Sequence, residues 1–254
     1  MKPTLSFEAG YGSINYKLNR PGSDEDKMFF YNPLFTDMYD GKMAENNVED
    51  KCPDRKHHDV RKLPKLFYKA NVNYLEILFA HRVVRYDALF DQLAAVREDI
   101  ATMNIPYLFD ACMGMYDQSY RYFQRDNAYV TLDELTDSLA QRKKVGKHAA
   151  GALRITDFMK RYANQGFMDF GSAISYDSEN AQDKVFIDTY MAMRNGDLSF
   201  GELDPLLKQA EIEANELKGF FKEKTIKEDV NQYVIETVRK HVREQLLVEL
   251  HRAL

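Results

Sequence analysis

The chain has 254 residues, of which 44% are hydrophobic and 30% are charged, and its formal net charge is −5. This composition is typical of a folded globular protein and argues against long disordered tracts, while the negative charge gives no general attraction to nucleic acid. The two cysteines show no CxxC or zinc-ligand spacing, so neither a disulfide framework nor a structural zinc is expected. No run of about eighteen apolar residues and no apolar leader segment occurs, so we expect a cytoplasmic protein without a membrane span.

The first sixty residues alternate between predicted strands and turns. Runs of strand-forming residues separated by Gly, Pro and Ser predict strands at 5–13, 24–33 and 57–63, a short helix at 14–19 and a turn at 20–23. The polar stretch 36–56 is rich in turn formers and is expected to be an exposed loop. Pro64 fits the first turn of a following helix, where its missing N–H costs nothing.

Beyond residue 65 the sequence has helical periodicity. One apolar face recurs every three to four residues, at Leu89, Leu93, Val96 and Ile100. Two capping boxes predict helices that begin near residues 132 and 200, namely Thr131 with Glu134 and Ser199 with Glu202. These helices are expected to end near Gly166 and Lys222, respectively.

The last helix is predicted at residues 229–252, with four valines along one face, Val230, Val234, Val238 and Val242. The stretch 166–180 is typical of a loop or a short strand. These patterns predict an α+β protein. A small N-terminal mixed sheet with helices, residues 1–80, is followed by a mostly α-helical region, residues 81–254.

A Gly-Ser turn and two acidic residues carry the strongest chemical signal. Gly12 has no Cβ to keep backbone N–H groups from phosphate oxygens, and Ser13 adds a hydroxyl donor. Asp24 and Asp26 are two residues apart on a predicted strand, so both carboxylates project from one face and can bind the same metal site. Acidic turns of this kind more often cap a strand or face solvent, but the nearby Gly-Ser turn favours the chemical interpretation.

A third carboxylate, Asp59, lies on the next predicted strand. Asp50 and Asp54 are close to it in the sequence and are alternatives for the same role. Carboxylates are suitable ligands for Mg²⁺, which prefers hard oxygen donors. The sequence therefore predicts an Mg²⁺ site beside a phosphate-binding turn.

Gly12-Ser13, followed by Ser23-Asp24-Glu25-Asp26, resembles the signature of the DNA polymerase β-type nucleotidyltransferase superfamily. Residues 57–79 are similar to the block that follows in one branch, the predicted nucleotidyltransferases related to the RNA-ligase-associated group. The resemblance implies a polymerase β-like core in which Gly12, Ser13 and Ser23 bind a nucleoside triphosphate. It further implies that Asp24, Asp26 and Asp59 bind two Mg²⁺ ions, for which Mn²⁺ can substitute. The chain departs from these relatives at Gly151, where they often have histidine.

Three basic residues of the helical region are further candidates for triphosphate binding, Lys147, Arg154 and Arg194. Lys147 and Arg154 are seven residues apart, so on one helix they face the same way, and Arg194 ends another helix before a glycine. The alternative interpretation, that these residues form a solvated basic face, has equal weight.

The function predicted from these residues is Mg²⁺-dependent transfer of NMP from an NTP such as ATP to a hydroxyl acceptor, with release of pyrophosphate. The acceptor is open among an RNA or tRNA end, a protein side chain and a small molecule. The RNA-ligase association favours an RNA end, whereas the net charge of −5 weighs against it. Two alternatives remain, a catalytically silent nucleotide-binding or interaction protein and a metal-dependent phosphohydrolase.

Overall fold

The protein is represented by a computed structural model that describes residues 2–20, 22, 25–48, 50, 52, 54–132 and 139–253. Its contacts divide the chain into two compact units, Met1–Asn104 with Ile226–Leu254, and Ile105–Thr225. The first unit contains a four-stranded mixed sheet and the second is helical, so the class is α+β, as predicted. The division by contacts falls at residues 104 and 226 and not near residue 80. Among the described residues, no helix is long and apolar enough to cross a membrane.

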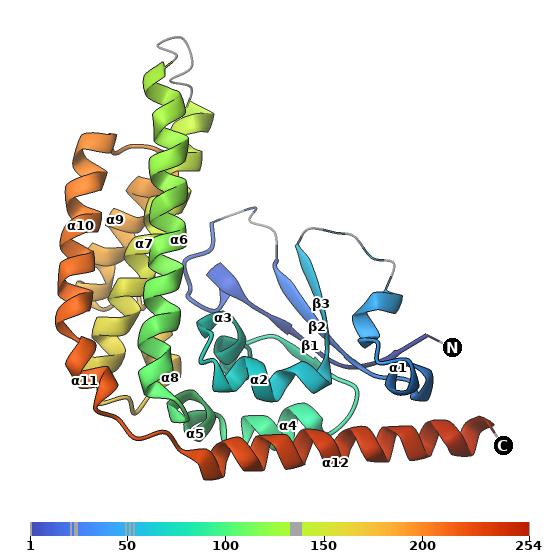
Figure 1. Ribbon diagram of the computed structural model, residues 1–254. Helices are drawn as coiled ribbons and strands as arrows, with labels where there is room; N and C mark the ends of the chain where they lie inside the picture. The colour runs from blue at the N-terminus through green and yellow to red at the C-terminus, as the bar shows by residue number, and fades with distance from the viewer. Residues whose placement is uncertain are drawn as a thin grey trace. The chain divides into compact units, whose positions relative to one another are not determined.

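The sheet of the first unit has the strand order β3-β2-β1-β4. Figure 1 labels its first three strands, β3, β2 and β1. Its strands are β1 (Thr4–Gly10), β2 (Lys27–Asn32), β3 (Arg55–Asp59) and β4 (Val83–Arg85). β1 pairs antiparallel with both β2 and β4, whereas β2 and β3 are parallel, with Lys27 opposite Arg55. Consequently β2, β3 and β4 all begin at the end of the sheet where β1 stops.

One face of the sheet forms the core of the first unit because alternate side chains point to it. Phe7 of β1 stacks on Phe30 of β2 with ring centroids 4.5 Å apart, and both side chains are fully buried. Phe7 also contacts Phe90, with the ring centroids 5.2 Å apart. The aromatic residues of the two central strands therefore hold the helices against the sheet.

The helices of the first unit are α1 (Phe35–Tyr39), α2 (Leu63–Tyr68), α3 (Val72–Leu75), α4 (Leu89–Ala94), α5 (Arg97–Thr102) and α12 (Glu228–Ala253). Four short 3-10 helices join them, η1 (Gly12–Ile14), η2 (Ala44–Asn47), η3 (Val60–Lys62) and η4 (Glu76–Phe79). Figure 1 shows α12 running beside α2 and α4. The buried His241 of α12 anchors this helix, since its Nε2 lies 2.9 Å from Asn32 Oδ1 at the end of β2 and 3.3 Å from Asp87 Oδ2.

The second unit consists of α6 (Ile105–Leu132), α7 (Leu139–Asn164), α8 (Phe170–Ile174), α9 (Ala181–Asn195), α10 (Phe200–Glu216) and α11 (Lys218–Lys222). Its core contains aromatic side chains, among them the buried Phe158 of α7 and Phe170 of α8, whose ring centroids are 5.3 Å apart. Helices α7 and α9 approach so closely that a Cβ on Gly146 would lie 1.8 Å from the Met193 carbonyl oxygen. Glycine is therefore required at this helix crossing.

The structure confirms several predicted elements and corrects others in the first unit. Strands β1 and β2 overlap the predictions at 5–13 and 24–33, and Pro64 lies in the first turn of α2. Of the strand predicted at 57–63, only residues 57–59 belong to β3, and the rest forms η3 and the start of α2. The helix predicted at 14–19 is instead the shorter η1 followed by a turn. The loop predicted at 36–56 contains most of α1 and all of η2, and β3 begins within it. Strand β4 was not predicted, because only three residues form it.

The predicted helix starts differ in outcome. The capping box at Ser199 is confirmed, since the Ser199 N–H and hydroxyl both donate to Glu202 Oε2, at 2.8 and 2.7 Å. The capping box at Thr131 is wrong, because α6 continues through Thr131 to Leu132; its partner Glu134 lies outside the described residues. The stretch 166–180, predicted as loop or strand, contains the short helix α8. In α12, Val234, Val238 and Val242 are buried as predicted.

Candidate nucleotide and metal site

The end of the sheet where β1 stops brings together residues from all four strands. Three backbone hydrogen bonds link these strand ends, Gly10 N to Arg82 O at 2.9 Å, Tyr11 N to Asp26 O at 3.1 Å, and Lys27 N to Asp54 O at 2.9 Å. The ends are thereby fixed relative to one another, which is what a site that must hold several groups in one geometry requires. The predicted Gly12-Ser13 turn leaves β1 at this end.

Gly12 is required in the turn for two reasons. Its φ of +78° is in the left-handed region, which favours glycine, and a Cβ at this position would lie 3.3 Å from Asp26 Oδ2. The second observation places the predicted turn and the predicted metal ligand in contact. Asp26 directly precedes β2 and is not part of the strand. The direction of its carboxylate is therefore not set by the alternation of side chains along a strand, as the sequence had predicted.

The backbone N–H groups of the turn were predicted to be available to phosphate oxygens, but the Gly12 N–H is already engaged. Gly12 N donates to Glu76 Oε1 at 2.9 Å, and Glu76 is fully buried at the start of η4. A buried carboxylate needs a donor, and this amide supplies one. Among the described residues, the hydroxyl of Ser13 makes no hydrogen bond, so it remains the donor of the turn that can meet a ligand.

Three carboxylates act on the Tyr11 side chain. Burial, followed by the negative charges of Asp26, Glu76 and Asp54, raises the pKa of Tyr11 well above its usual range. The Lys56 ammonium lies over the Tyr11 ring, 4.5 Å from its centroid. The phenol therefore keeps its proton at neutral pH and offers a hydroxyl donor beside a region of negative potential.

Asp54 and Asp26 occupy equivalent positions, each directly before the first residue of one of two adjacent parallel strands. Each directly precedes a member of the register pair formed by Lys27 of β2 and Arg55 of β3. Neighbouring strands are about 4.8 Å apart, so carboxylates at equivalent positions are within reach of one metal site. Among the described residues, no group of three His, Cys, Asp or Glu side chains is arranged to hold a metal ion, and the predicted ligand Asp24, like Ser23, lies outside those residues.

Asp59 lies at the opposite end of β3, paired with Tyr31. At about 3.3 Å per residue, its strand position is roughly 16 Å from Asp26, whereas two catalytic metal ions are about 4 Å apart. Asp59 is fully buried, and both of its oxygens accept structural hydrogen bonds. Oδ1 accepts from Arg61 N and Nε at 2.8 and 2.9 Å, and Oδ2 accepts from Arg61 Nη2 at 2.6 Å and Ala44 N at 2.8 Å. The structure thus brings Asp54, and not Asp59, to the end of the sheet that carries Asp26.

A pocket of about 420 Å³ opens between the start of β2 and β4. Asp26 lines it together with Gly10 and Ile14 from the glycine turn, and with three basic residues, Lys27, His81 and Arg82. Lys27 Nζ lies 3.4 Å from Glu8 Oε1, and Arg82 forms an exposed ion pair with Glu25. The exposed Arg82–Glu25 pair can exchange partners at small cost, and the Lys27 ammonium is itself exposed and makes only a long contact with Glu8, so both cations can turn to the phosphates of a ligand.

The three basic residues predicted in the helical region all lie in the second unit. Lys147 and Arg154 are both on α7, as predicted, but Lys147 is exposed whereas Arg154 is only 7% exposed. Arg154 lies close enough to Tyr176 for its charge to act on the phenol, within the core of that unit. Arg194 is half-buried in the last turn of α9, before the left-handed Gly196 that ends the helix. Of the three, Lys147 presents its charge to solvent most fully.

Sequence reasoning missed four residues of this site, Glu76, Lys27, His81 and Arg82. Glu76 directly follows α3, whose first turn is capped by Asn71, which accepts from Asn73 N at 3.1 Å. Arg82 precedes the unpredicted β4, so its place beside Gly10 had no sequence signal. Lys27 directly follows Asp26, which was the available hint.

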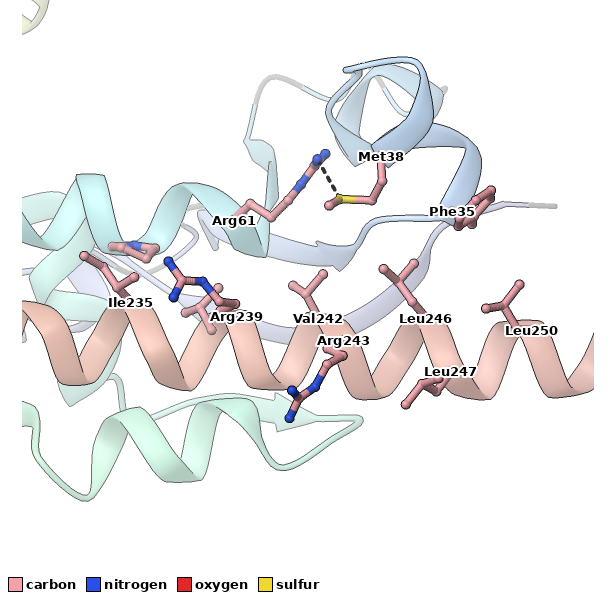
Figure 2. A pocket seen from close by; sticks show the side chains of 12 residues that line it. Phe35, Met38, Arg61, Ile235, Arg239, Val242, Arg243, Leu246, Leu247 and Leu250 are labelled. Atoms are coloured by element: carbon pink, nitrogen blue, oxygen red, sulfur yellow. Dashed lines mark hydrogen bonds between the residues drawn. The ribbon is translucent and has the colours of Figure 1, made fainter.

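A second pocket, of about 490 Å³, lies between α1 and α12 and is lined by apolar side chains together with three arginines, Arg61, Arg239 and Arg243. Figure 2 shows Phe35 and Met38 of α1 facing Val242, Leu246 and Leu250 of α12. No carboxylate of the described residues lines this groove. Its described lining therefore offers no carboxylate ligand for a hard metal ion.

Comparisons of the chain with protein-family models, with curated proteins and with solved structures find no match.

Proposed function

We propose that the protein is a Mg²⁺-dependent nucleotidyltransferase that moves NMP from an NTP to a hydroxyl acceptor and releases pyrophosphate. The observation that carries the proposal is the convergence of the Gly12-Ser13 turn, Asp26 and Asp54 at one end of the sheet, next to a pocket with basic side chains. Nucleotidyl transfer needs phosphate donors, carboxylate metal ligands and cations in one place.

The described carboxylates suit a magnesium ion, because they are hard oxygen donors; Asp26 lines the pocket, and Asp54 directly precedes the neighbouring strand. Asp26 and Asp54 would hold the metal, with Asp24 as the further ligand that the sequence motif supplies. The bound metal would stabilise negative charge on the entering and leaving oxygens at the α-phosphorus. Asp54 takes the role that sequence reasoning gave to Asp59.

The remaining residues bind and orient the triphosphate. Lys27 leaves the half-buried Glu8 and Arg82 leaves the exposed Glu25 to neutralise phosphate oxygens, and the Ser13 hydroxyl donates to one of these oxygens. Tyr11 keeps its proton at neutral pH and would donate its hydroxyl to an oxygen of a ligand bound beside these carboxylates. Glu76 is a positioning residue, because its bond to Gly12 N fixes the turn and its close approach to Asp26.

A second candidate, a catalytically silent nucleotide-binding protein, is favoured by one observation. The Gly12 amide is engaged by Glu76, so the turn offers fewer backbone donors than a phosphate cradle ordinarily does. In that case, nucleotide would bind in the Asp26 pocket without transfer.

The test is a transfer assay with ATP labelled at the α- or the γ-phosphate, Mg²⁺, and three acceptors: an RNA 3′ end, a small polyol and the protein itself. We expect α-label in an acceptor and γ-label in pyrophosphate. Asp26→Asn and Asp54→Asn should each lower the rate roughly a hundredfold or more, since each removes a metal ligand. The exposed Asp229→Asn, at the start of α12, is the matched control and should leave the rate unchanged.

The other outcomes distinguish the alternatives. Binding of labelled ATP with no transfer to any acceptor would contradict the proposal and support the silent module. Release of phosphate or NMP without an acceptor would instead identify a phosphohydrolase.

A further inference from the structure

The second unit carries a cluster of basic side chains in which α6 and α7 lie side by side. The described stretches 117–127 and 139–148 contain six Lys or Arg residues against two Asp, in a chain whose net charge is −5. All six cations are exposed: Arg121, Arg125, Arg142, Lys143, Lys144 and Lys147. We call this set the α6/α7 basic patch. The joining residues 133–138 include three acidic residues and lie outside the described part, so the charge count alone does not carry the argument.

A buried carboxylate organises the patch. Asp126 of α6 is 1% exposed and contacts three basic groups from both helices. Its Oδ1 lies 2.8 Å from Arg125 Nη2, and its Oδ2 lies 3.2 Å from Lys144 Nζ and 3.3 Å from His148 Nε2. One anion therefore holds cations of two helices together, while their outer hydrogen-bond positions face solvent.

An aromatic ring lies within the same cluster. Tyr122 is 38% exposed, the Arg125 guanidinium lies 4.8 Å from its ring centroid, and the His148 ring lies 5.3 Å from it on a tilted plane. Lys143 and Lys147, four residues apart on α7, are neighbours on one face of the helix. A guanidinium over a partly exposed aromatic ring, with exposed lysines on the adjacent helix, is a combination by which proteins bind single-stranded nucleic acid, through the backbone phosphates and a stacked base.

We propose that the α6/α7 basic patch binds single-stranded RNA, the acceptor in the proposed transfer reaction. The role of the RNA as acceptor rests on the proposed function, whereas the binding of RNA to the patch does not. In this proposal the exposed Lys147 binds RNA phosphates and not the triphosphate, which is bound by Lys27 and Arg82 of the first unit.

The experiment measures the affinity of the full chain for a fluorescent RNA of about 20 nucleotides by anisotropy, without NTP or metal, from about 50 to 200 mM salt. The test variant is Lys143→Gln/Lys147→Gln. The control is Lys184→Gln/Lys218→Gln, which removes the same charge from exposed positions of α9 and α11. The test pair should weaken binding roughly tenfold and lower the slope of log affinity against log salt by about 1.4, because each phosphate contact contributes about 0.7. The control pair should retain the wild-type affinity.

A second variant tests the organisation of the patch. Asp126→Asn makes the patch more positive but removes the anion that holds Arg125, Lys144 and His148, so RNA affinity should fall in protein that still unfolds cooperatively. Duplex DNA of the same length is the comparison ligand and should bind more weakly. Absence of RNA binding, equal losses in the test and control pairs, or equal affinity for duplex DNA would each overturn the inference. Because the assay contains no NTP, these results are independent of whether transfer occurs.

Discussion

Replacing Asp59 by alanine separates a structural carboxylate from a catalytic one. The substitution removes the acceptor of four hydrogen bonds and leaves Arg61, whose side chain is 21% exposed, without its closest anion. Removing one partner of a buried ion pair costs 3–5 kcal/mol, and the partial exposure of Arg61 favours the lower end, so we expect the free energy of unfolding to fall by about 3 kcal/mol. For a chain of this size the melting temperature should fall by roughly 6–12 °C.

The assay is urea unfolding followed by circular dichroism, combined with ATP binding measured below the transition. The surface Asp40→Ala, which removes only an exposed pair with Lys42, is the control and should change stability by less than about 0.5 kcal/mol. Folded Asp59→Ala should bind ATP and Mg²⁺ as the wild type does. Unchanged stability together with lost binding would refute the reasoning and return Asp59 to the metal site.

Three further predictions follow from single contacts. Gly12→Ala should lower the free energy of unfolding by about 1–2 kcal/mol and also weaken ATP binding, because its Cβ crowds Asp26. Gly41→Ala, at φ +66° with open space around it, should lower stability without affecting ATP binding. Equal ATP affinity in the two variants would contradict this prediction. Burial, followed by the charge of Lys62, lowers the pKa of His58 from 6.5 to about 4. The contribution of neutral His58 to the free energy of unfolding should therefore be fully present above pH 6.5 and should decline as the pH falls towards 4. In urea melts at several pH values, His58→Gln should reduce this decline, whereas the exposed His251→Gln should not. Gly146→Ala should destabilise the second unit by several kcal/mol because α7 and α9 cross so closely at this position. Gly114→Ala, with no atom within 4 Å of the added Cβ, should be neutral or stabilise the protein by up to about 1 kcal/mol. Similar melting temperatures of the two variants would show that the crossing can widen.

The sequence predicted those elements whose signals are local. The Ser199 capping box and the valine stripe of α12 depend on neighbouring residues and were confirmed. The box at Thr131 failed because the same four-residue pattern can occur inside a long helix, where packing of α6 overrides the cap. Strand β4 has three residues, too few to establish an alternating pattern.

The site was predictable only in part, because strand register is not a local property. The contact of Gly12 with Asp26 follows a motif within fifteen residues and was expected. The choice between Asp54 and Asp59 depends on where β3 begins and on its parallel pairing with β2, neither of which is visible in the sequence. Likewise, Glu76 reaches Gly12 from sixty-four residues away, through the packing of η4 against the turn.

The account's central claim is that Asp26 and Asp54, at one end of the sheet, hold the metal of a bound nucleotide. The most direct measurement is an electron paramagnetic resonance titration of Mn²⁺ in the presence of a non-hydrolysable ATP analogue. We expect tight Mn²⁺ binding in the wild type and in Asp59→Asn, and its loss in Asp26→Asn and Asp54→Asn. Mn²⁺ binding that survives both of the latter substitutions but is lost in Asp59→Asn would contradict the account.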